Sequence, residues 1–81
     1  MSFQTKFIKE MEGKGYLVLK TIRLNKNGFP DVIMLKEGKT TFVELKDGND
    51  TLKPLQQARI DELRKKGFEA YCLHDKKGVV Y

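Results

Sequence analysis

Gly28-Phe29-Pro30-Asp31 begins the stretch of sequence that decides the fold, and Glu44-Leu45-Lys46 ends it. The segments 31–35 and 40–46 are rich in β-branched and large apolar residues, and a short polar link containing a glycine separates them. Such runs predict two antiparallel strands joined by a tight turn. If residues 37–38 form a two-residue loop, counting outward along the strands places Asp31 opposite Glu44.

This pairing predicts a cluster of three charged side chains. Side chains two residues apart on a strand share a face, so Glu44, Lys46 and the cross-strand neighbour Asp31 should converge. Two directly opposed carboxylates destabilise a strand pair by up to about 1 kcal/mol unless a cation lies between them. A divalent metal such as Mg²⁺ suits an open site of this kind. Taken singly, the two motifs are also compatible with an ordinary turn and an exposed ion pair.

The composition is that of one globular domain, residues 1–81, with no room for a second core. Lys and Arg number 16 against 11 Asp and Glu, and this excess favours a polyanionic partner. No apolar run approaches the roughly 18 residues of a membrane span, and no signal-peptide pattern begins the chain, so we expect a cytoplasmic location without a membrane partner. The single cysteine, Cys72, should be a buried and inert thiol.

Two helices and further strands are expected around the hairpin. Apolar spacing predicts a helix from Phe3 to about Met11, with Ser2 as a possible N-cap, and another from Lys53 or Pro54 to Lys65 or Lys66. Residues 16–19 read as a strand that 21–24 continue, 68–73 form another, and 79–81 form a short strand or tail. The order α-β-β-β-α-β predicts an α/β fold with a mixed central β-sheet flanked by two helices.

Other polar residues are candidates for a site near the hairpin. Gln4 falls inside the apolar stripe of the first helix, where it is either a partly buried amide or a site residue. Gln56 belongs to the inward side of the second helix near its start. Asp47 and Asp50 are either outer metal ligands acting through water or simple turn residues.

The charged residues in the loops indicate a function less specifically. Three cations before Gly28 are candidate phosphate contacts, although solvated lysines are common beside loops; they are Lys20, Arg23 and Lys26. The lone histidine, His74, has no second histidine or cysteine beside it, so we expect a solvated turn residue.

The Pro-Asp and Glu-x-Lys pattern resembles the active-site motif of the PD-(D/E)XK nuclease superfamily. In detail the chain is similar to the VRR-NUC branch, small nuclease domains found in phages and in larger repair proteins. The resemblance covers nearly the whole chain and implies a small restriction-endonuclease-like fold. It is carried by Gly28-Phe29-Pro30-Asp31, by Phe42-Val43-Glu44-Leu45-Lys46, by Leu52-Lys53-Pro54-Leu55-Gln56 with the later Ile60, Leu63 and Gly67, and by Lys14-Gly15-Tyr16.

The resemblance also implies roles for individual residues. Asp31 and Glu44 would bind Mg²⁺ or Mn²⁺ with the backbone carbonyl of Leu45 as a further ligand. Lys46 would position or activate the attacking water, and Gln56 matches a glutamine at the edge of the site.

The first helix departs from the family pattern. Ser2 stands where the family commonly carries a glutamate, and Gln4 matches a glutamine near it. The helix-one acid is therefore replaced by Gln4, supplied by Glu10 or absent.

The function implied by the resemblance is metal-dependent, structure-specific cleavage of DNA phosphodiester bonds. Stand-alone phage members are similar to Holliday-junction resolvases, homodimers that cut branched DNA, and a phage-encoded protein would act in the host cytoplasm. The missing glutamate motivates an alternative, a non-catalytic nucleic-acid-binding module on a nuclease scaffold. A third hypothesis is a subunit that needs a partner protein for activity.

Overall fold

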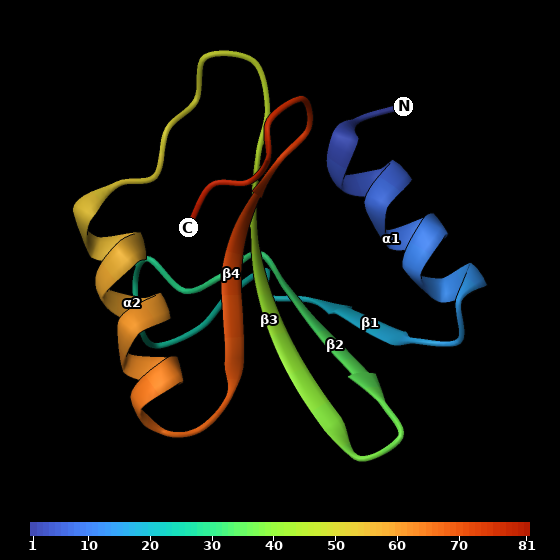
Figure 1. The fold of residues 1–81 in the computed structure, drawn as a ribbon, viewed down its shortest axis with the longest axis horizontal. Helices are drawn as coiled ribbons and strands as arrows, with labels where there is room; N and C mark the ends of the chain where they lie inside the picture. Colours follow the sequence, from blue (N-terminus) through green and yellow to red (C-terminus); the bar gives the residue numbers. More distant parts are fainter.

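A five-stranded mixed sheet with one helix on each face organises residues 1–81, all of which the computed structural model describes (Figure 1). The strand order is β1-β2-β3-β4-β5, and only the β3–β4 pair is parallel. The expected order of elements and the mixed sheet are therefore confirmed. The elements are α1 (Phe3–Gly13), β1 (Leu17–Lys20), β2 (Val32–Lys36), β3 (Lys39–Lys46), α2 (Pro54–Lys65), β4 (Glu69–His74) and β5 (Gly78–Val79).

The β2–β3 hairpin has the predicted register. Lys36 pairs with Lys39, and Ile33 pairs with Phe42. Glu37 and Gly38 both have positive φ, 52° and 78°, as a tight two-residue hairpin turn requires. The ladder ends at Val32 and Val43, one residue short of the predicted Asp31–Glu44 pair.

The prediction that residues 21–24 continue the first strand was wrong. β1 ends at Lys20, whose partner Val32 is the first residue of β2, so the next residues have no neighbouring strand to pair with. Residues 21–31 form a loop instead. Its two ends are held together by the N–H of Thr21, which donates to the carbonyl of Asp31 over 3.0 Å.

Alternation along β3 divides the core between the two faces of the sheet. Val43 and Leu45 face α1 and pack in a cluster that includes Phe7. Phe42 faces α2 and packs with Ile60 and other buried residues. Glu44 and Lys46 share the parity of Phe42 and thus lie on the α2 face.

Both helices begin where the sequence predicts, and α2 buries only two of its residues. Ser2 caps α1, its hydroxyl accepting from the N–H of Thr5. On α2 the buried residues are Ile60 and Leu63, whereas the apolar residues Leu55 and Ala58 are exposed. Neither helix has the length and apolar character needed to cross a membrane.

Candidate active site

Glu44 is a buried carboxylate in the middle of the molecule. It is 3% exposed, and its Oε1 atom has no hydrogen-bond partner. Burial, together with the nearby Asp31 carboxylate, raises its pKa from an ordinary 4.5 to about 7, although Lys46 acts in the opposite direction. The fold therefore holds an acceptor atom that lacks a donor or a cation, which is costly in a protein interior.

Asp31 lies beside Glu44 but is held through the backbone of β3. Its Oδ2 accepts from the N–H of Leu45 over 2.8 Å, across the point where β2 and β3 stop pairing. Pro30 directly before it is fully buried. The hairpin therefore positions Asp31 as the sequence predicts, although not as a ladder partner of Glu44.

Lys46 is equally buried, at 4% exposed, and is ion-paired on both sides. Its Nζ lies 3.3 Å from Oε2 of Glu44 and 3.4 Å from Oδ2 of Asp50. Burial lowers the pKa of Lys46, but the two carboxylates, Glu44 foremost, outweigh burial and leave it raised above 10.5. At neutral pH the raised pKa keeps Lys46 as an ammonium that donates hydrogen bonds.

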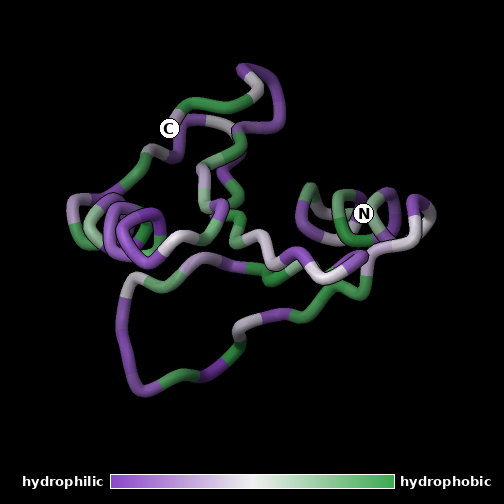
Figure 2. Tube along the Cα trace, turned by 60° about the horizontal axis from the view of Figure 1, so that its bottom comes forward, coloured by the Kyte–Doolittle hydropathy of each residue, from purple (hydrophilic) through white to green (hydrophobic).

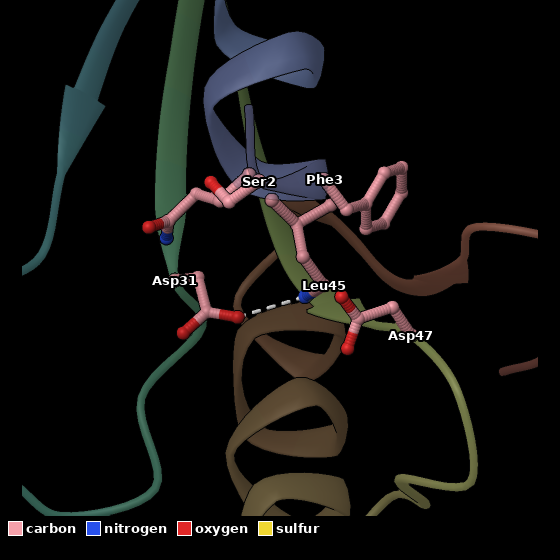
Figure 3. A pocket seen from close by; sticks show the side chains of 6 residues that line it. Ser2, Phe3, Asp31, Leu45 and Asp47 are labelled. Atoms are coloured by element: carbon pink, nitrogen blue, oxygen red, sulfur yellow. Dashed lines mark hydrogen bonds between the residues drawn. The ribbon is translucent and has the colours of Figure 1, made fainter.

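The residues that follow Glu44 in β3 line two different hollows, and Glu44 itself lines neither. Asp31 lines one of about 280 Å³ with Gln4, Leu45 and Asp47. Figure 3 shows Asp31 and Asp47 on opposite sides of Leu45, below the N-terminal end of α1. Lys46 lines the other hollow, of about 200 Å³. The three predicted charges thus meet at Glu44, while the two outer ones face different openings.

The remaining candidates fall into separate groups. Gln4 is half-buried and lines the hollow of Asp31, and Asp47 joins it there. Gln56 is also half-buried, but its Oε1 accepts from the N–H of Lys53 as part of the α2 cap. Asp50 contacts Lys46 and Lys53. Glu10, which forms an exposed ion pair with Lys14, does not line the hollow of Asp31.

The three predicted phosphate contacts lie at the start of the loop that leads to Asp31. Lys20 is the last residue of β1, and Arg23 and Lys26 line a third hollow formed by that loop. All three are exposed.

The expectation that His74 is a solvated turn residue was wrong. His74 is 4% exposed and ends β4 opposite Lys46. Its Nδ1 accepts from the N–H groups of Lys76 and Lys77, so Nε2 carries the proton and donates to the carbonyl of Gly48 over 2.9 Å. The β3–β4 pairing buries the ring, which then holds the loop after Lys46 in place.

Cys72 is buried, as expected, beside Glu44 in the sheet register. Burial, and then the Glu44 charge, raise the pKa of its thiol. A thiol of this kind is not an activated nucleophile.

The donor set at Glu44 fits one hard cation. The carboxylates of Asp31 and Glu44 and the backbone carbonyl of Leu45 offer the oxygen ligands that such ions prefer. The Oε1 atom of Glu44 has no other partner that would compete with an ion. No group of three or more His, Cys, Asp or Glu side chains gathers around a common point. A cation held here would therefore keep several water ligands.

Comparison with known proteins gives one consistent result. No curated protein matches the chain. A solved structure described as a VRR_NUC domain matches with a TM-score of 0.74 and 31% sequence identity, over 85% of this chain and 76% of that one. The sequence profile of the VRR-NUC domain matches residues 4–76. With this geometry and these matches, the chain belongs to the VRR-NUC domain family, a family of nuclease-type domains.

Proposed function

We propose that this VRR-NUC domain is a metal-dependent, structure-specific DNA endonuclease that hydrolyses phosphodiester bonds. The observation that carries the proposal is the buried Glu44 carboxylate, whose Oε1 lacks a partner while Asp31 lies beside it and Lys46 contacts its other oxygen. A buried acid with one unpartnered oxygen and a raised pKa is typical of a site that holds a ligand or performs chemistry.

Mg²⁺ or Mn²⁺ would be held by the Asp31 and Glu44 carboxylates with the carbonyl of Leu45. When bound, such an ion supplies Lewis-acid activation of a phosphoryl oxygen and of water. Glu44 and Asp50 hold the Lys46 ammonium in place. From there it would donate a hydrogen bond to the reacting phosphate and stabilise the extra negative charge of the transition state. Because it stays protonated, we assign Lys46 to positioning the attacking water and not to deprotonating it.

The expected partner is branched DNA, as for the stand-alone phage members that the chain resembles. A net charge of +5 favours a polyanion. A homodimer would cut both strands of a symmetric junction, since a two-fold axis repeats the site. Light scattering tests this part, and a strict monomer with full activity on four-way junctions would contradict it.

Cleavage assays test the central proposal. Purified protein is incubated with a four-way junction and with linear duplex, in Mg²⁺ or in EDTA, beside Asp31→Asn and Lys46→Met. Both variants should lose activity by orders of magnitude, whereas Glu12→Gln, an exposed acid on α1, should match the parent. Cleavage that persists in EDTA or in Asp31→Asn would refute the mechanism.

A non-catalytic nucleic-acid-binding module is the second candidate. The observation in its favour is that α1 and its cap Ser2 contribute Ser2, Phe3 and Gln4 to the hollow of Asp31 but no acid. Steeply salt-dependent DNA binding with no metal-dependent cutting of any substrate would support this alternative.

A further inference from the structure

The loop between β1 and β2 exposes large apolar side chains among cations. Ile22 is 86% exposed, the highest value among the large hydrophobic residues, and Leu24 is 47% exposed. Arg23 lies between them, and Lys20 and Lys26 flank them. The open arc at the bottom of Figure 2 is this loop, in which hydrophobic and hydrophilic residues alternate. Single exposed hydrophobic residues are ordinary, but two of them interleaved with three cations are not explained by folding.

The loop also encloses a hollow of about 280 Å³ that contains no acid. Ile22, Leu24 and Phe29 supply its apolar lining, and Arg23 and Lys26 supply its charge. Neither of these two cations forms an ion pair within the chain. The hollow therefore has a mostly polar surface with unneutralised positive charge, and the exposed Ile22 and Leu24 side chains lie beside it. Together these features are complementary to a nucleotide.

Several contacts fix this loop relative to Asp31. Besides its N–H bond to the Asp31 carbonyl, Thr21 donates its hydroxyl to the carbonyl of Pro30. At the other end Arg59 donates to the carbonyl of Asn27 over 2.8 Å. The loop that encloses the hollow is thus anchored at one end to the backbone of the predicted catalytic acid and at the other to α2.

We propose that this hollow binds one unpaired nucleotide of the DNA substrate, an inference that rests on the proposed nuclease function. Ile22 and Leu24 would contact the face of the base, while Arg23 and Lys26 would contact the flanking phosphates. A fully paired duplex presents phosphates to the cations but leaves the apolar side chains in water. Apolar side chains are used against bases that have left the stack, and a nucleotide that is already unpaired enters at the lowest cost. The loop therefore selects branched, bulged or flapped DNA.

The test separates binding from cleavage. Glu44→Gln protein, unable to cut, is titrated into two short duplexes, one with 2-aminopurine as a single-nucleotide bulge and one with 2-aminopurine fully paired. The bulged duplex should bind about tenfold more tightly, with a change in 2-aminopurine fluorescence. Introducing Ile22→Ser into the Glu44→Gln protein should remove most of this preference. The affinity for the paired duplex should change by less than about twofold. Adding Val79→Ser, which alters a 63% exposed hydrophobic residue on β5, should change neither affinity.

Two outcomes would overturn the inference. One is equal affinity for bulged and paired DNA. The other is a preference that survives Ile22→Ser, and a change of oligomeric mass in light scattering on that substitution would identify the loop as a protein interface instead. If the parent protein cuts no DNA but keeps an Ile22-dependent preference for the bulge, the nuclease proposal fails and the nucleotide site stands.

Discussion

The buried Glu44 carboxylate should make the metal-free protein less stable than its Glu44→Gln variant at neutral and alkaline pH. The pKa of Glu44 in the folded protein, about 7, lies above the ordinary value of 4.5. Between pH 4.5 and pH 7 the folded state therefore keeps a proton on Glu44 that the unfolded state has lost. The stability that the protonated carboxyl contributes is fully present below pH 4.5 and is lost as the pH rises through 7. Gln resembles the protonated acid in shape and cannot ionise.

The size of the effect follows from the same two pKa values. The gap between 4.5 and about 7 corresponds to about 3 kcal/mol once the pH is well above 7. The attraction of Lys46 is already included, because it lowers the pKa of Glu44. In a domain of this size about 3 kcal/mol corresponds to roughly 12–24 °C in Tm. At pH 4 the two proteins should differ little.

Thermal unfolding followed by circular dichroism in EDTA, at several values between pH 4 and pH 8.5, measures the difference directly. Glu12→Gln, an exposed acid on the same protein, is the matched control and should follow the parent at every pH. Mg²⁺ should raise the Tm of the parent at pH 8 and leave that of Glu44→Gln unchanged, since binding to the folded state stabilises it. A variant that is less stable than the parent at pH 8, or a difference that does not vary with pH, would refute the reasoning.

Three further substitutions probe the supports of the site. Lys46→Met leaves the buried Glu44 carboxylate without its cation and should cost about 3 kcal/mol in urea unfolding at pH 8, with a smaller loss at pH 5 where Glu44 is protonated; an equal loss at both would contradict the pairing. His74→Ala removes three hydrogen bonds to backbone groups and should cost roughly 2 kcal/mol, with faster amide exchange confined at first to residues 46–50. Gly28→Ala should destabilise more than Gly38→Ala, because both have φ near 75° but only the first Cβ would come within 2.7 Å of a leucine on α2; equal losses would show that the close packing is unimportant.

The hairpin and the general plan of the fold could be predicted from the sequence because they depend on local signals. The period of two along each strand, and a glycine in the two-residue link, fix which side chains share a face. The observed register from Val32–Val43 to Lys36–Lys39 follows from these signals alone. The order of helices and strands likewise follows from apolar spacing and from the caps and glycines that end each element.

Other features were decided only by contacts between distant segments. His74 looks like a turn residue in the sequence, but parallel pairing with β3 places it opposite Lys46 and buries it. Residues 21–24 have the composition of a strand, yet the β1–β2 ladder ends at Lys20 and Val32, and beyond it Thr21 bonds to the carbonyl of Asp31 without extending the strand. The sequence by itself determined which charges can share a face of the hairpin. Tertiary packing decided that Glu44 is buried, because desolvation depends on what distant elements place around it and no local pattern encodes that environment.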